Sequence, residues 1–285
     1  MNQLAFNSSM PRSGSELIQA ILSQHPEVEC STTSPLLEYF YGSLNNLNGV
    51  EAKSQEHAEE YYSAFVKGGI DAYVKKAFGK DRSKKKLYID KSRGWIYYYN
   101  VFEKMYGSQP PVICMIRDAA EVLASMEQLH LRSDLKTGDP LQNVTTDERV
   151  RHWLEKTPVG LAIRRIINSV HELKQSRDQG KSRPILFVRY EDLCERPEEI
   201  LKTVTTFLGL RDFEFDLDNI KKVPGEDERH FGGFQDLHTV KQKFDSTNAK
   251  PKAIDVFGEA LTQNIKERCA VYQNIFGYNT EKTNK

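Results

Sequence analysis

Four short runs of apolar residues predict the strands of a sheet. They lie around Leu4–Phe6, at Lys86–Asp90, at Pro111–Ile116 and at Ile185–Tyr190. The last two runs are apolar almost without interruption, which is typical of strands that helices cover on both faces of a parallel sheet. The pattern therefore predicts a sheet in the middle of the molecule.

Helical spacing of apolar residues fills most of the segments between these runs. Helices are expected from the turn at residues 8–14 through Leu22, over 119–129, from Asp147 to Arg177, from Pro197 to Gly209 and from Ile254 to about Phe276. The charged segment 50–86 is also expected to be mostly helical, and residues 130–148 to form a long mobile loop. Strands that alternate with helices predict a single α/β domain over residues 1–285, with a doubly wound sheet.

Three of the four predicted strands end in charged residues. Asp90 and Lys91 end the second strand, Arg117 and Asp118 follow the third, and the fourth runs into the sequence RYED at 189–192. The carboxyl ends of parallel strands meet at one edge of a sheet, and ligands of doubly wound folds bind there. A functional site is expected at this edge.

The first strand leads through a Ser/Pro/Gly turn into a helix, an arrangement that suits an anion. Backbone N–H groups of Ser13, Gly14, Ser15 and Glu16 would converge at the helix N-terminus, where the helix dipole also favours negative charge. Arg12 adds a planar guanidinium suited to phosphate or sulfate oxygens. The loop lacks the Gly-Lys-Ser/Thr ending of nucleoside triphosphatases. Without a ligand, Ser13 and Glu16 would be explained equally well as a capping box.

Two further segments offer groups for a phosphorylated ligand. Arg117 leaves the end of a strand, and Ser125 lies two helical turns further on, so that both side chains could grip one phosphate. The alternative for Arg117 is half of a surface ion pair. Tyr190, just past a buried strand, could hydrogen-bond or stack on a ligand, or simply cap the sheet edge.

Composition narrows the class of protein. The 285 residues contain 40 Lys plus Arg and 40 Asp plus Glu, so that no overall basic field favours nucleic acid or an anionic membrane. The four Cys residues form no Cys-x-x-Cys pair, and no His/Cys motif predicts a metal site. No run approaches the about 18 apolar residues of a membrane span, and no leader segment is evident. A soluble cytoplasmic protein with buried reduced thiols is expected.

Three segments together resemble sulfotransferases. PRSGSEL at 11–17 resembles their 5′-phosphosulfate loop, commonly PRSGTTL or PKSGTTW. VICMIRDAAEVLASM at 112–126 resembles their 3′-phosphate motif, an Arg after a strand with a Ser eight residues further on. RYEDLCERPEEIL at 189–201 follows in the order and spacing of the family, so that the resemblance covers about residues 4–210. The loop is especially similar to that of tyrosylprotein sulfotransferases and bacterial relatives.

The resemblance implies a fold, a donor and a chemistry. The fold would be the α/β fold of sulfotransferases, related to the P-loop nucleoside triphosphatases, with a mostly parallel sheet flanked by helices. The donor would be 3′-phosphoadenosine 5′-phosphosulfate (PAPS), and the product 3′,5′-bisphosphoadenosine (PAP). Sulfuryl transfer in this family uses no metal, so that the loop needs no hydroxyl ligand for magnesium.

Site roles carry over from the resemblance by position. Arg12 would contact the 5′-phosphosulfate and stabilise charge on the bridging oxygen, and the backbone of residues 13–16, with the Ser15 hydroxyl, would hold the 5′-phosphate. Arg117 and Ser125 would bind the 3′-phosphate, and Tyr190 would lie near the nucleotide. Lys91 would assist the leaving group.

The sequence departs from the family pattern at two places. Glu16 stands where the family has a second Thr, which removes one phosphate hydroxyl. In tyrosylprotein sulfotransferases a Glu general base follows the loop helix at a short fixed distance, but the matching stretch here is ECSTTSP at 29–35. Glu38 is the nearest acid beyond it and is the predicted base, with a solvent-facing helical Glu as the alternative; His130 and His238 are further candidates.

The expected activity is transfer of a sulfuryl group to a hydroxyl acceptor, and the sequence does not say whether that acceptor is a carbohydrate, a peptide tyrosine or a small alcohol. Two other functions are consistent with the same loop. An ATP-dependent small-molecule kinase would require magnesium and a Walker-type Lys, which the loop lacks. A non-catalytic relative would keep the nucleotide site and lack the base.

Overall fold

The computed structural model describes residues 3–46, 54, 56–79, 84–133, 141–156, 158–180, 182–225, 239–249 and 252–279. Its five-stranded sheet is made of β1 (Leu4–Asn7), β2 (Val28–Thr33), β3 (Leu87–Lys91), β4 (Val112–Ile116) and β5 (Ile185–Arg189). The strand order is β2-β3-β1-β4-β5 and all neighbouring pairs are parallel. The predicted α/β class and the four predicted strands are confirmed, with β1 in the centre.

The sequence pattern missed β2. This strand lies at one edge of the sheet, and its sequence VECSTT is mostly polar. Only alternate residues are buried, beginning with Val28 and Cys30, and the hydroxyl residues between them hide that alternation from a hydrophobicity pattern. At the edge of the sheet, β2 pairs with β3 on one side only.

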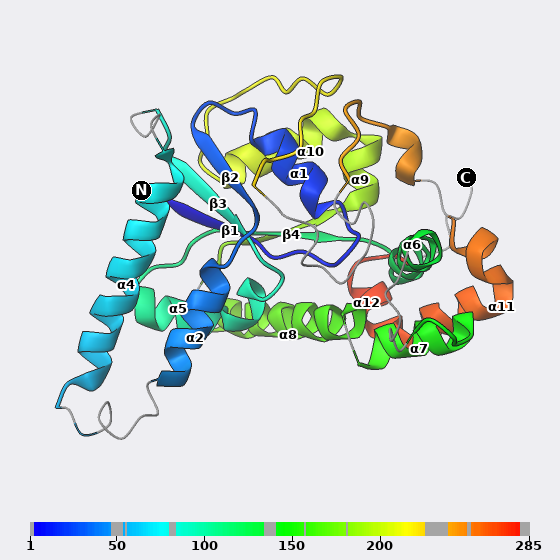
Figure 1. Ribbon diagram of the computed structural model, residues 1–285, viewed down its shortest axis with the longest axis horizontal. Helices are drawn as coiled ribbons and strands as arrows, with labels where there is room; N and C mark the ends of the chain where they lie inside the picture. Colours follow the sequence, from blue (N-terminus) through cyan, green and yellow to red (C-terminus); the bar gives the residue numbers. More distant parts are fainter. Residues whose placement is uncertain are drawn as a thin grey trace.

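Helices cover both faces of the sheet (Figure 1). On one face lie α1 (Ser15–Leu22), α9 (Tyr190–Glu195) and α10 (Pro197–Phe207). The other face and the ends of the sheet are covered by α2 (Leu36–Asn46), α4 (Ala58–Ala77), α5 (Trp95–Tyr106), α6 (Ala119–Arg132), α7 (Thr146–Glu155), α8 (Val159–Asp178), α11 (Ala253–Arg268) and α12 (Ala270–Ile275), and a short 3₁₀ helix spans Ser246–Ala249.

Alternation along the central strands explains their continuous apolar runs. In β4, Ile113 and Met115 pack into the core shared with α1, α9 and α10, whereas Cys114 and Ile116 pack into the core shared with α6, α7 and α8. Both faces are therefore buried, and each residue of the strand must be apolar. None of the described helices is both long and apolar enough to cross a lipid bilayer.

Two predicted helices are broken in the structure. The helix expected from Asp147 to Arg177 is α7 followed by α8, with Pro158 immediately before α8. Proline has no N–H to donate in a helix interior, which favours a break at Pro158. At Gly160 a Cβ would lie 1.6 Å from the Leu154 carbonyl oxygen, so that the two helices meet too closely there for a larger residue. The last predicted helix is interrupted at Gly258, where φ is 73°, and ends at Arg268 before α12.

The predicted loop at 130–148 is shorter than expected. His130 belongs to the last turn of α6, and α7 begins at Thr146 behind a capping box formed by Thr145 and Glu148. Residues 134–140, the centre of the predicted loop, lie outside the described residues.

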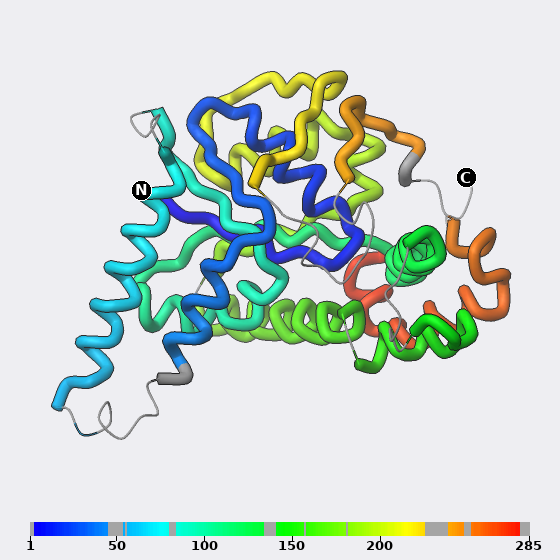
Figure 2. Tube along the Cα trace, in the orientation of Figure 1, coloured from blue at the N-terminus to red at the C-terminus, as the bar shows by residue number. Residues whose placement is uncertain are grey.

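Segments far apart in the sequence meet at the carboxyl edge of the sheet. Figure 2 shows that the loop after β1 runs beside the end of β4 and the C-terminal helix α12. The Tyr272 hydroxyl of α12 lies 2.7 Å from the sulfur of Met10 and donates a hydrogen bond of 2.9 Å to the Arg117 carbonyl oxygen. The end of β4 and a helix about 260 residues later in the chain thus meet at the loop after β1.

Candidate donor-nucleotide site

The loop between β1 and α1 has a backbone conformation that exposes the start of the helix. Arg12 has φ of 58° and Gly14 has φ of 86°, both in the left-handed region. Two features exclude a side chain at Gly14. One is the left-handed φ, and the other is that a Cβ would lie 2.6 Å from the Tyr190 ring. This glycine therefore lets the loop turn and lets Tyr190 approach the helix N-terminus.

The predicted capping box of Ser13 and Glu16 is wrong. The N-cap of α1 is Gly14 rather than Ser13, so that the N-cap residue has no side chain with which to cap the helix. The Ser13 hydroxyl lies 2.7 Å from the Met10 carbonyl oxygen and 3.0 Å from that of Met115, which ties the loop to β4. The Ser13 hydroxyl is thus directed to backbone carbonyl oxygens and not to the amides at the start of α1.

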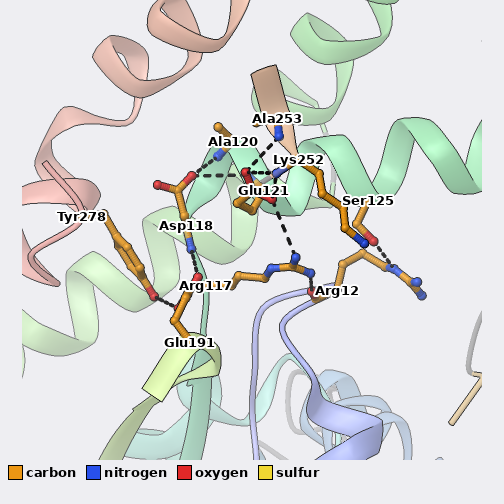
Figure 3. A network of polar contacts seen from close by, with 10 residues as sticks. All are labelled: Arg12, Arg117, Asp118, Ala120, Glu121, Ser125, Glu191, Lys252, Ala253 and Tyr278. Carbon is orange, nitrogen blue, oxygen red and sulfur yellow. Dashed lines mark hydrogen bonds and ion pairs between the residues drawn. The ribbon is translucent and has the colours of Figure 1, made fainter. Parts of the chain in front are cut away.

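Four of the predicted ligand residues meet at this loop, and Figure 3 draws Arg12, Arg117 and Ser125. Arg12 donates through Nε to the Ser125 hydroxyl at 3.1 Å, and Arg117 donates through Nη1 to the Arg12 carbonyl oxygen at 3.1 Å. The Arg117 guanidinium also lies over the Tyr190 ring, 4.7 Å from its centroid. The structure brings together Arg12, Arg117, Ser125 and Tyr190 from three separate segments.

The site concentrates positive charge. Burial lowers the pKa of the Arg12 guanidinium, and the nearby positive charges of Arg132 and Arg117 lower it further. Arginine remains protonated in proteins, so that this clustering costs free energy, which a bound polyanion would offset. Sequence reasoning missed Arg132, whose helix α6 begins at the strand end that supplies Arg117.

Carboxylates around Arg117 hold the backbone of the site in place. Asp118 caps α6 by accepting hydrogen bonds from the amides of Ala120 and Glu121, at 2.8 and 3.2 Å. Glu121 lies at the capping-box position of α6, three residues after Asp118, but the Asp118 amide donates to Glu191 instead. Glu121 accepts hydrogen bonds of 2.9 Å from the amides of Lys252 and Ala253 and lies 3.8 Å from Arg117.

The C-terminal segment completes this arrangement. Glu191 accepts hydrogen bonds from the Asp118 amide at 3.2 Å and from the Tyr278 hydroxyl at 3.0 Å, and its burial raises the pKa of the carboxyl group. The Tyr272 hydroxyl accepts a hydrogen bond of 3.3 Å from the Arg117 amide. These tyrosines carry no local sequence signal, because their partners lie about 90 and 155 residues away.

Lys91 and Glu16 form a second polar cluster at the same edge. The register pairs Lys91 of β3 with Asn7 of β1 and with Thr33 of β2. The Lys91 ammonium forms an ion pair with the Glu16 carboxylate and donates a hydrogen bond of 3.2 Å to the Thr33 hydroxyl. The side chains are 8% exposed for Lys91 and 12% for Glu16, so that this pair is largely buried.

Two of the predicted bases lie on described helices, and the third lies outside the described residues. Glu38 lies in the first turn of α2 with its side chain exposed to solvent. His130 is buried near the end of α6, where its ring centroid lies 6.2 Å from that of Trp153. His238 lies outside the described residues. Within the described part of the chain, no three His, Cys, Asp or Glu residues are grouped as metal ligands.

Comparison with known proteins finds sequences that are similar to this chain. A sequence model described as "Sulfotransferase family" matches residues 5–214. A Caenorhabditis briggsae protein named "Putative protein-tyrosine sulfotransferase" is 21% identical over 286 aligned residues, which cover 99% of this chain and 91% of that protein.

Solved structures share the fold. The sulfotransferase domain of the Synechococcus PCC 7002 olefin synthase aligns with a TM-score of 0.57 at 20% identity, over 98% of this chain and 96% of that one. The sulfotransferase domain from the curacin biosynthetic pathway aligns with a TM-score of 0.57 at 17% identity, over 95% and 98%. Together with the sequence model, which covers more than half of the chain, these findings show that the protein belongs to the sulfotransferase family.

Proposed function

We propose that this protein transfers a sulfuryl group from PAPS to a hydroxyl acceptor. The observation that carries the proposal is the cationic cluster beside the N-terminus of α1, where Arg12, Arg117 and Ser125 are linked by hydrogen bonds of 3.1 Å. PAPS carries negative charge at both its 3′ and 5′ positions, and a helix N-terminus and paired guanidinium groups are the elements that bind such groups.

The donor would extend across the two parts of the cluster. The amides of residues 13–16 at the start of α1 would bind the 5′-phosphate, together with the Ser15 hydroxyl. Arg117 and Ser125 would bind the 3′-phosphate. The Tyr190 ring, which already contacts Arg117 through its face, would lie beside the nucleotide.

The reaction requires stabilisation of charge on the oxygen that leaves the sulfur. When bound, the donor supplies an activated sulfuryl group whose S–O bond to the 5′-phosphate breaks during in-line attack by the acceptor hydroxyl. Arg12 would stabilise the charge that develops on that bridging oxygen, and Lys91 would assist from the end of β3. Fixed positive charge in a site that excludes water is an effective way to lower such a barrier.

A thermal-shift titration tests the donor site. Wild-type protein is titrated with PAP in the presence of a chelator and, separately, with ATP and magnesium. PAP at 100 times its dissociation constant should stabilise the folded state by about 2.7 kcal/mol. Arg117→Ala should weaken PAP binding about 10- to 150-fold, because a hydrogen bond to a charged group contributes about 1.5–3 kcal/mol.

The matched control is Arg196→Ala. Arg196 is half-exposed and pairs with Glu199 at 2.9 Å, so that its loss should leave PAP binding unchanged. Stabilisation by ATP with magnesium but not by PAP would refute the proposal and favour a kinase. PAP binding without sulfuryl transfer to water, a phenol, a sugar or a tyrosine peptide would indicate a non-catalytic relative.

A further inference from the structure

Arg117 lies where the backbone pairing of β4 with β5 stops. The register between the two strands ends with Ile116 opposite Arg189, and Arg117 follows directly. Its backbone groups meet one side chain from a distant part of the chain, Tyr272 of α12. The Tyr272 hydroxyl accepts a hydrogen bond of 3.3 Å from the Arg117 amide and donates one of 2.9 Å to the Arg117 carbonyl oxygen. A single side chain therefore satisfies both polar groups of the Arg117 backbone.

The same hydroxyl also reaches the loop after β1. It lies 2.7 Å from the sulfur of Met10, two residues before Arg12. The Tyr272 side chain is fully buried, and burial raises the pKa of its hydroxyl well above the ordinary value. The hydroxyl therefore stays protonated and keeps a hydrogen for the Arg117 carbonyl oxygen. One oxygen atom thus contacts both segments that are proposed to hold the donor.

Neighbouring residues hold Tyr272 at this edge of the sheet. Gln273 donates a hydrogen bond of 3.0 Å to the Asp118 carboxylate. Tyr278 donates to Glu191, which accepts from the Asp118 amide (Figure 3). The C-terminal segment therefore contacts residues that follow β1, β4 and β5. It lies beyond the part of the chain that the family model matches, so that this arrangement does not follow from membership of the family.

We propose that Tyr272 is a positioning residue of the donor site, an assignment that rests on the proposed function. Its hydroxyl would set the position of Arg117 relative to the loop that carries Arg12. The 3′- and 5′-phosphates of the donor are joined through one nucleoside, so that both bind well only if the two groups of protein ligands are held at a matching separation. In this position the Arg117 guanidinium donates to the Arg12 carbonyl oxygen at 3.1 Å.

Loss of the hydroxyl should disturb the 3′-phosphate contact more than the 5′-phosphate contact. Tyr272 holds Arg117 by two hydrogen bonds to its backbone, whereas its contact with the loop is made to a thioether sulfur, which is a weak acceptor. In Tyr272→Phe the aromatic ring remains, but the amide and the carbonyl oxygen of Arg117 lose this partner. The Arg117 backbone can then shift, and its side chain shifts with it.

Calorimetry of Tyr272→Phe with two nucleotides tests this prediction. PAP carries both phosphates, and adenosine 5′-phosphate lacks the 3′-phosphate. Y272F should bind PAP about 3- to 10-fold more weakly than wild type, a range that corresponds to one neutral hydrogen bond. Its affinity for adenosine 5′-phosphate should change much less, so that the ratio of the two affinities falls.

Tyr99→Phe is the matched control. Tyr99 of α5 is 2% exposed, and its hydroxyl donates a hydrogen bond of 3.0 Å to the Pro110 carbonyl oxygen, just before β4 begins. Y99F therefore removes the same chemical group from the opposite end of the same strand. Both variants should lower the urea concentration at the midpoint of unfolding, whereas only Y272F should weaken PAP binding.

The double variant R117A/Y272F tests whether Tyr272 acts through Arg117. If it does, the double variant should bind PAP as weakly as Arg117→Ala alone, because the side chain that Tyr272 positions is already absent. A general loosening of the fold would instead add to the effect of Arg117→Ala.

Each other outcome has a distinct meaning. Failure of wild type to bind PAP refutes the proposed function and, with it, this assignment. PAP binding by wild type with equal binding by Y272F refutes the assignment alone. Equal weakening by Y99F and Y272F, additive effects in R117A/Y272F, or failure of Y272F to fold in saturating PAP would show a role in stability only and would also overturn it. If Y272F is partly unfolded, the dependence of its urea midpoint on PAP concentration gives the affinity of the folded molecules.

Discussion

The close approach of Tyr190 to the donor loop can be tested by adding a single methyl group. Gly14→Ala places a Cβ 2.6 Å from Cδ2 and 2.9 Å from Cε2 of the Tyr190 ring, at a residue whose φ is 86°. Two penalties should add: the strain of a left-handed conformation and the displacement of a packed aromatic ring.

The expected losses in the free energy of unfolding distinguish backbone strain from displacement of the ring. The left-handed conformation costs an alanine about 1–2 kcal/mol, and overpacking costs about 1–3 kcal/mol. We therefore expect Gly14→Ala to lower the free energy of unfolding by about 2–5 kcal/mol. Gly180→Ala has a similar φ of 69° but meets no atom within 4 Å, so that it should lose only the strain of about 1–2 kcal/mol.

Urea unfolding of the two variants measures this difference. In a Tyr190→Ala background the ring is absent, and Gly14→Ala should then cost no more than Gly180→Ala. A shifted ring would also move away from Arg117, so that Gly14→Ala should weaken PAP binding whereas Gly180→Ala should not. Equal losses of stability for both glycine variants, in the presence of Tyr190, would refute the packing described here.

Three further predictions follow from individual contacts. Ser125→Ala removes the acceptor of the Arg12 hydrogen bond and, on the proposed function, one contact to the 3′-phosphate; calorimetry should show PAP affinity reduced about fivefold, or about 1 kcal/mol. Arg149→Met leaves the Glu127 carboxylate, 2% exposed, without its guanidinium and should lower the free energy of unfolding by about 3–5 kcal/mol; the double variant with Glu127→Leu should recover most of this in urea. Burial raises the pKa of Asp90 to about 6, so that the folded protein retains a proton that the unfolded chain releases. The stability of wild type relative to Asp90→Asn should therefore fall as the pH rises from about 4 to about 6, and a constant difference across this range would contradict the assignment.

Arg149→Met and Ser125→Ala should differ in whether they change stability or nucleotide binding. Arg149 and Glu127 pair with each other across α7 and α6, so that exchanging the pair should leave nucleotide binding unchanged. Ser125 lies at the cluster itself and should alter binding with little effect on stability. Weaker PAP binding in the Arg149 variant, or a large loss of stability in Ser125→Ala, would contradict these assignments.

The sequence alone predicted most of the strands and helices, and it singled out the loop between β1 and α1. A strand buried on both faces must be continuously apolar, so that β4 is recognisable from its sequence. The loop after β1 is recognisable because its signal lies in consecutive residues. The edge strand β2 gave no such signal, and the break between α7 and α8 depends on how closely Gly160 approaches Leu154, which no periodicity reports.

Only the tertiary structure decided which side chains act together. Glu16 and Ser13 fit a capping box by spacing, but the end of β3 supplies Lys91 to the first, and the end of β4 supplies a carbonyl oxygen to the second. Likewise, Glu121 turns from its own helix to the amides at the start of α11. Local spacing describes the partners that a side chain has within its own segment. When parallel strands end at one edge, charged groups from distant segments become closer and stronger partners, and these determine the site.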